Sequence, residues 1–209
     1  VSRRSPWPGG GDLPKEYWHT HDLFVGLAMA AAVTTTIKIG AGICLIVERD
    51  PITTAKEVAS LDFLSNGRLL FGIGGGWNAE EMADHGSAFE ARWRLTRERV
   101  LAMRAIWSTH PAEYHGALVD VDPLLAPPAP LQPGGPPILL GAQATWALRR
   151  VVEYCDGWMP IHGRRDILGN NAGMRIRKRP QDCTAAGWHK VLDSNLTSAF
   201  LCSQAAYPA

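Results

Sequence analysis

Residues 61–82, LDFLSNGRLLFGIGGGWNAEEM, constrain the fold of this chain more than any other segment. An apolar strand predicted at residues 68–73 leads into three consecutive glycines, and a polar helix start follows. Because glycine lacks a Cβ, Gly74, Gly75 and Gly76 can adopt positive φ and leave bare N–H groups beside a helix N-terminus that attracts anions. The segment therefore predicts a loop for a phosphate-bearing ligand. A tight strand-to-helix turn without a ligand is the simpler alternative.

A Rossmann-type dinucleotide loop is the other interpretation of the same glycines. Residues 74–79 formally fit G-x-G-x-x-A after a strand. However, the bulky Trp77 lies inside the turn, and no acidic residue ends a second strand about twenty positions later, where a ribose partner belongs. Residues 91–107, which lie at that distance, read as a helix, so this interpretation is disfavoured.

Strand and helix patterns alternate along the chain, which is typical of parallel βα units. Strands are predicted at residues 37–47, 68–73, 138–141 and 157–161. Helices are predicted at residues 22–33, 51–64, 87–108 and 145–154, with a further helix start after Asn78 and a Pro-rich connection at residues 120–137. In the long third helix, Trp93, Val100, Met103 and Trp107 share one face, which indicates core packing.

Composition argues against several classes of protein. The chain has 209 residues, 46% of them hydrophobic and 20% charged, with a net charge of +1, which is typical of a globular protein and not of a nucleic-acid binder. No apolar run approaches the roughly 18 residues of a membrane-spanning helix. The four cysteines form no C-x-x-C pair, and His19 and His21 precede a helix, so we predict no metal site. Asp22 or His21 is expected to cap that helix. We expect a cytoplasmic protein.

Five segments together resemble the luciferase-like monooxygenase family, in its deazaflavin (coenzyme F-420)-dependent oxidoreductase branch. They are LPKEYWHTHDLFV, the stretch from RDPITTAKEV through WNAEEMADHG, RERVLAMRAIW, EYHG and DGWMP. The resemblance covers residues 5 to about 163, and the stretch at residues 50–86 is the most specific part.

This resemblance implies an α/β fold, a TIM (β/α)8 barrel, with a flavin or deazaflavin at the carboxyl ends of its strands. By this resemblance the chain contains about four parallel βα units of such a barrel, the third through sixth. By the same resemblance Cys44 lies near a bulged, sometimes cis, peptide that backs the cofactor ring. The other implied cofactor-binding residues are Gly74, Gly75, Gly76, Trp77, Asn78 and, as a second phosphate contact, Gly141. Asp84 and His85 follow the glycines closely enough to face the site or to belong to a surface loop.

The implied chemistry is hydride transfer, or oxygenation through O₂ activation, by coenzyme F-420 or FMN acting on a small-molecule substrate. Because the cofactor performs the difficult step, no catalytic side chain is identified from the sequence.

A second resemblance begins near Arg165. Residues 165–209 resemble the interior of a short-chain dehydrogenase/reductase, with the NNAG motif at residues 170–173 and Asn195 at the position of that family's catalytic asparagine. The glycine loop and the Tyr-x-x-x-Lys pair of that family are absent, so Asn195 would be catalytic only in a complete reductase, and NAD(P) is not the expected cofactor.

The sequence therefore predicts a truncated luciferase-like barrel domain at residues 1–163 and a short Rossmann-type βα fragment at residues 164–209. Two alternatives to the oxidoreductase hypothesis stay open, a non-catalytic chimeric or truncated product and an NAD(P)-dependent short-chain reductase remnant. An unclosed sheet has unpaired edges, so association into a homo-oligomer through those edges is a further expectation.

Overall fold

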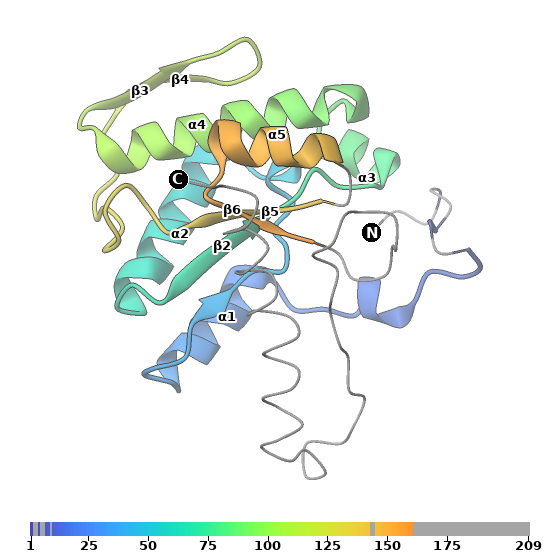
Figure 1. The fold of residues 1–209 in the computed structure, drawn as a ribbon, viewed down its shortest axis with the longest axis horizontal. Helices are drawn as coiled ribbons and strands as arrows, with labels where there is room; N and C mark the ends of the chain where they lie inside the picture. Colours follow the sequence, from blue (N-terminus) through green and yellow to red (C-terminus); the bar gives the residue numbers. More distant parts are fainter. Residues whose placement is uncertain (2–3, 5–6, 9, 143–144, 161–209) are drawn as a thin grey trace, which may run out of the picture. The chain divides into compact units, whose positions relative to one another are not determined.

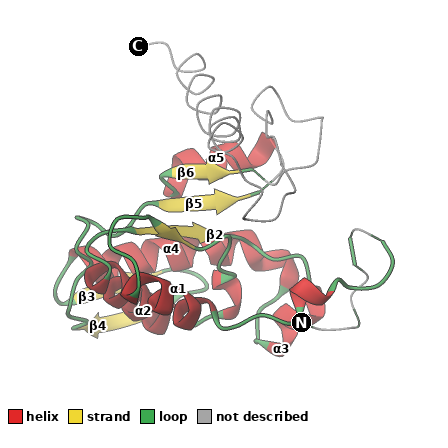
Figure 2. Ribbon diagram, turned by 90° about the horizontal axis from the view of Figure 1, so that it is seen from below, coloured by secondary structure: helices red, strands yellow, loops and turns green. Residues whose placement is uncertain are grey.

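A parallel sheet and an antiparallel hairpin organise the computed structural model, which describes residues 1, 4, 7, 8, 10–142 and 145–160 (Figure 1). The sheet has the strand order β1-β2-β5-β6, and the hairpin pairs β3 with β4. The strands are β1 Ile39–Gly40, β2 Leu69–Ile73, β3 Ala112–His115, β4 Asp120–Leu124, β5 Ile138–Gly141 and β6 Gly157–Met159. The helices are α1 Leu23–Ala32, α2 Pro51–Leu64, α3 Ala79–Asp84, α4 Arg92–Ser108 and α5 Thr145–Tyr154. Figure 2 shows β2, β5 and β6 pointing in the same direction.

The chain divides into two compact units. The first comprises Val1–Gly141 with Leu148–Met159 and contains the whole sheet and the hairpin. The second comprises Ala142–Ala147 and residues 160–209, most of which lie outside the described residues. The predicted reductase-like fragment at residues 164–209 is among the residues not described.

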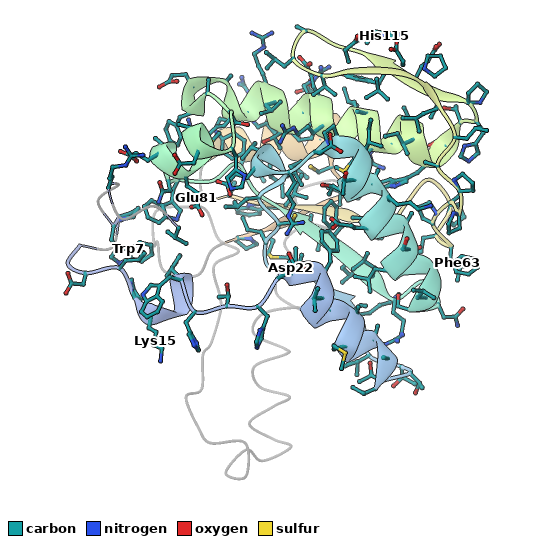
Figure 3. All side chains as sticks on the ribbon, turned by 180° about the vertical axis from the view of Figure 1, so that it is seen from behind. Trp7, Lys15, Asp22, Phe63, Glu81 and His115 are labelled. Atoms are coloured by element: carbon teal, nitrogen blue, oxygen red, sulfur yellow. The ribbon has the colours of Figure 1, made fainter. Side chains whose placement is uncertain are left out.

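Local signals explain why the helices begin where they do. Asp22 caps α1, since its Oδ1 accepts hydrogen bonds from the backbone N–H groups of Phe24 and Val25 at 2.9 and 3.1 Å. These backbone hydrogen bonds hold the pKa of Asp22 below its usual range, and so does the Arg49 guanidinium, which also bonds the Asp22 carboxylate. Figure 3 shows Asp22 where the segment after Lys15 enters this helix. The predicted Asp22 cap is thus confirmed.

Helix α2 has the same kind of start and a clear end. Asp50 accepts from the Thr53 N–H at 2.7 Å, and Pro51 occupies the first turn, where its missing N–H is harmless. The helix ends before Asn66 and Gly67, which adopt φ of 58° and 70°. These bounds, like those of β5 and α5, agree with the sequence prediction.

The strand predicted at residues 37–47 is wrong over most of its length. Only Ile39–Gly40 is regular strand, Cys44 forms an isolated bridge with Ile73, and Ile46–Glu48 is a 3₁₀ helix. The Ala41 N–H donates to the Leu70 carbonyl, and the Cys44 N–H donates to the Gly72 carbonyl. The three residue steps from Ala41 to Cys44 therefore lie opposite only two steps on β2. One extra residue therefore bulges out of the ladder, and alternation in the sequence could not reveal it.

The Pro-rich connection at residues 120–137 contains a strand that the sequence prediction missed. Strand β4 pairs with β3, and the turn between them is held by Glu98 of α4, whose Oε2 accepts from the N–H groups of Leu118 and Val119 at 2.6 and 3.0 Å. Further along, Gln132 bonds both carboxylate oxygens of the fully buried Asp62. The hairpin turn is thus fastened to α4, and the connection that follows the hairpin is fastened to α2.

The core lies between the strands and the helices that follow them. Leu69, Phe71 and Ile73 of β2 are fully buried, as are Val100 and Met103 of α4, which confirms the predicted core face of that helix, although Trp93 is only half buried. A second cluster joins the hairpin to α4 and consists of Val47, Met82, Leu95, Ala102, Val119 and Val121.

The described residues contain no helix long and apolar enough to cross a bilayer. Within the same part of the chain, no three histidine, cysteine or acidic side chains gather as metal ligands would.

Candidate functional site

The carboxyl ends of β1, β2 and β5 meet at one edge of the sheet because these strands run parallel. Three of the residues singled out in the sequence lie at this edge: Cys44 and Gly74 in the loops that leave it, and Gly141 as the last residue of β5. Cys44 and Gly74 are joined directly, since the Gly74 N–H donates to the Cys44 carbonyl at 3.0 Å. Parallel topology thus gathers residues that are almost one hundred positions apart.

Ile43 fills the space that two of these glycines leave open. A Cβ placed on Gly74 would lie 2.0 Å from Ile43 Cδ1, and one placed on Gly141 would lie 2.8 Å from Ile43 Cγ2. The peptide bond between Gly42 and Ile43 is cis. This bond lies in the bulge next to Cys44, in agreement with the expectation drawn from the family resemblance.

A cavity of about 440 Å³ opens beside the bulge. It is lined by Leu23, Ile43, Cys44, Leu45, Glu48, Arg49 and His85. One wall is therefore the bulged segment with the end of the 3₁₀ helix that follows it, and the start of α1 and the end of α3 supply the rest. The volume falls within the range of roughly 300–1,000 Å³ that is usual for small-molecule sites.

The polar groups of this cavity differ in charge state. Burial raises the pKa of the Cys44 thiol to about 12, so Cys44 is a neutral wall group and no nucleophile at neutral pH. Burial and the nearby Glu81 raise the pKa of Glu48 to about 7. Arg49 is already engaged, because its guanidinium bonds Asp22 at 2.7 Å and Glu57 at 3.3 Å.

A cationic and aromatic cluster adjoins Gly75. A Cβ on Gly75 would lie 3.0 Å from the Trp93 ring, so the glycine permits that ring to approach. The Arg150 guanidinium lies 4.6 Å from the centroid of Trp93, and that of Arg92 lies 3.8 Å from the centroid of Phe89. Burial and Arg150 lower the pKa of Arg92. Two guanidinium groups therefore lie near each other, beside the glycine loop.

The expected positive φ is found only at Gly76, with φ of 71°, and is wrong for Gly74 and Gly75. Those two glycines serve the close approach of Ile43 and Trp93 instead. A Cβ on Gly76 would lie 3.8 Å from Glu48 Oε1, so this glycine adjoins the cavity.

Trp77 and Asn78 have structural roles. The Trp77 ring packs edge-on against Trp7 and Tyr17, with centroids 5.4 and 6.4 Å apart. Asn78 is buried and caps α3, since its Oδ1 accepts from the Glu81 N–H at 2.9 Å. Neither role was assigned to Trp77 or Asn78 by the sequence, and their contact with a cofactor stays a prediction.

The sequence missed several residues of this region, namely Glu48, Arg49, Arg92, Trp93 as a wall of the glycine loop, and Arg150. These residues belong to no sequence motif, and only their burial and their neighbours in the structure distinguish them. Of the pair after the glycines, His85 lines the cavity, whereas Asp84 pairs with Arg4 on the surface. Asn195 lies outside the described residues.

The chain is similar in sequence to the members of one protein family. The model of the family described as luciferase-like monooxygenase matches residues 10–179. An uncharacterised protein of Mycobacterium tuberculosis is 42% identical over 171 residues, which cover 80% of this chain and 60% of the relative. The F-420-dependent hydroxymycolic acid dehydrogenase of the same organism is 32% identical over 152 residues, covering 70% of this chain and 41% of that protein. The chain thus spans less than two thirds of the length of each of these relatives.

Solved structures share the fold. An F-420-dependent secondary alcohol dehydrogenase, solved with an F-420–acetone adduct, superposes with a TM-score of 0.62 at 21% identity, covering 69% of this chain and 44% of that one. The oxygenating component of 3,6-diketocamphane monooxygenase from Pseudomonas putida, solved with FMN, gives a TM-score of 0.53 at 23% identity, covering 59% of this chain and 37% of that one. The four parallel strands therefore correspond to part of a luciferase-like barrel.

Proposed function

The chain belongs to the luciferase-like monooxygenase family, and we propose that it contributes part of an oxidoreductase site that holds coenzyme F-420 or FMN at the carboxyl edge of the sheet. The observation that carries this proposal is the cavity beside the bulge, because it joins the side chains of Leu23, Ile43 and Leu45 to a few polar groups. The whole enzyme's substrate is a small molecule in this proposal.

The residues present fit such a cofactor in two places. The bulged segment with Ile43, Cys44 and Leu45 offers an apolar surface, and its Cys44 thiol is neutral, so an uncharged ring can lie against it. Arg92 and Arg150, beside Gly75, offer positive charge to a phosphate. Gly74 fits less well than the sequence suggested, because Ile43 fills its open side.

The bound cofactor supplies hydride transfer, or activation of O₂ when its reduced flavin form is used. The chain's own residues bind and orient. The bulged segment supports the ring, and the apolar side chains of Leu23, Ile43 and Leu45 exclude water from the ring's surroundings. Glu48 and His85 are the polar groups at hand for a substrate.

Titration of the full chain with coenzyme F-420 and, separately, with FMN tests this proposal. We expect the fluorescence of at least one of the two to change saturably on binding. If neither cofactor shows a fluorescence or absorbance change, the proposal fails. The choice between the two cofactors follows from the same pair of titrations.

Replacing Arg150 with alanine is expected to weaken cofactor binding by about tenfold or more, because a charge-assisted hydrogen bond to phosphate contributes roughly 1.5–3 kcal/mol. The neighbouring Arg149, which is exposed on α5, provides the matched control, and Arg149→Ala should change the dissociation constant by less than about twofold. Equal losses in both variants would show that general charge attraction, and not this cluster, accounts for binding. The measurement is the same titration at fixed ionic strength.

Self-association is a separate proposal. Among the described residues, β1 and β6 end the strand order of the sheet, and each offers a backbone edge to a second copy. Light scattering across a range of protein concentrations decides between a monomer and such an assembly.

A further inference from the structure

Glu48 is the one acidic residue that lines the cavity. It ends the 3₁₀ helix Ile46–Glu48, directly after the bulged wall, and is half buried. Its Oε1 is out of reach of solvent and has no hydrogen-bond partner among the described residues. A charged oxygen in that position is unfavourable, whereas a protonated carboxyl is tolerated.

The charged groups around Glu48 do not offset the cost of ionising its buried carboxyl. Glu81 of α3 is negative and acts against ionisation, while the Val1 ammonium, which pairs with Glu81 at 3.3 Å, and Arg49 act in favour of it. Arg49 is held by Asp22 and Glu57, and Arg99 of α4 donates to the Ile46 carbonyl. No salt bridge to Glu48 forms within the described part of the chain, and the net effect with burial is the raised pKa of about 7.

We propose that Glu48 is a specificity-determining residue of this cavity, which recognises an uncharged hydrogen-bond acceptor of the substrate, such as a ketone oxygen, by donating its carboxyl proton. This inference takes the cavity to be the ligand site of the proposed function, and it names the class of substrate group that the site accepts.

The cavity discriminates among three kinds of guest group. An anion meets the carboxyl of Glu48 and finds Arg49 already shared by two carboxylates. A cation would gain from ionised Glu48 but must enter beside Leu23, Ile43 and Leu45, which cannot solvate it. A neutral carbonyl gains a hydrogen bond and leaves no charge buried, so it is the favoured guest.

Three cyclohexyl compounds that differ in their head group test this inference directly on the full chain. Cyclohexanone, cyclohexanecarboxylate and cyclohexylammonium are titrated at about pH 6 and about pH 8.5, on either side of the Glu48 pKa, and binding is followed by saturation-transfer NMR. Wild type, Glu48→Gln and Glu48→Leu are compared. His85 lines the same cavity and is left in place in Glu48→Gln, so a pH profile that this variant abolishes is assigned to Glu48.

We expect cyclohexanone to bind most tightly at the acidic pH and to weaken by roughly tenfold or more at the basic pH, as Glu48 loses its proton. Glu48→Gln keeps a neutral donor, so it should bind the ketone with less than about twofold change across pH, and Glu48→Leu should bind it weakly at both. The inference is overturned if cyclohexanone does not bind at acidic pH, if either charged probe binds more tightly there, or if Glu48→Gln retains the wild-type profile. These probes are titrated without a cofactor. The inference about Glu48 can therefore be judged even if the F-420 and FMN titrations show no binding.

Discussion

Gly72→Ala is expected to destabilise the fold by about 3 kcal/mol, a large share of the roughly 5–15 kcal/mol that usually separates folded from unfolded protein. A Cβ at this position of β2 would lie 2.0 Å from the backbone carbonyl oxygen of Ala41 and 3.1 Å from Met159 Cε. The backbone of Ala41 cannot move aside cheaply, because the hydrogen bond from the Cys44 N–H to the Gly72 carbonyl at 2.8 Å holds the bulge in place. The loss should appear as a lower denaturant midpoint in circular dichroism.

A glycine without close neighbours is the matched control. Gly26 lies within α1, and an added Cβ there meets nothing within 4 Å. Gly26→Ala should stabilise the chain by roughly 0.5–1 kcal/mol, because alanine is the better helix former. If Gly72→Ala unfolds at the wild-type denaturant concentration, the close packing of β2 against the bulge is wrong.

Arg68→Met is expected to cost about 2–4 kcal/mol, since it leaves one buried and three partly buried carbonyl groups without this donor. Arg68 is 8% exposed and precedes β2. Its guanidinium donates to the carbonyl oxygens of Ala31, Thr34, Ile37 and Ser65 and to the Thr34 hydroxyl, at 2.7–3.0 Å. One side chain thus closes the end of α1 and joins it to the start of the sheet.

Two further variants separate geometry from charge and size. Arg68→Lys retains the charge but has no planar fork, so it should recover less than half of the lost free energy of unfolding. Arg94→Met, on the exposed side of α4, should stay within about 0.5 kcal/mol of wild type. Full recovery by lysine would show that charge alone, and not the fork of hydrogen bonds, stabilises this end of α1.

Where the sequence prediction succeeded, the determining interactions are local. The start of α2 follows from an aspartate cap and a proline in the first turn, and its end follows from the Asn66-Gly67 pair in left-handed backbone. Asp22 caps α1 and α3 begins after Asn78, both as predicted, for the same reason. Parallel pairing of β2, β5 and β6 was also predictable, because alternating strands and helices favour it.

The failures involve contacts distant in sequence. The bulge after Ala41 depends on pairing with β2, and β4 contains Pro123, which argues against a strand when read alone. The glycines were recognised as special, but Gly74 and Gly75 make room for Ile43 and Trp93, partners 31 and 18 positions away, and not for positive φ. Glu48 became a candidate only once its burial and its neighbour Glu81 were known.

The central claim is that the cavity beside the bulge is where the ligand binds, and a pair of tryptophan variants on one helix tests it most directly. Leu23 lines the cavity from the first turn of α1, whereas Val25, two residues on, is 63% exposed and lines no part of it. Fluorescence titration with coenzyme F-420 and FMN is carried out on wild type, Leu23→Trp and Val25→Trp, with thermal melts to verify folding. We predict that wild type and Val25→Trp bind alike and that the folded Leu23→Trp variant loses about tenfold or more in affinity, because the indole occupies the cavity. Equal affinity in all three proteins, or no binding by wild type, would contradict the claim.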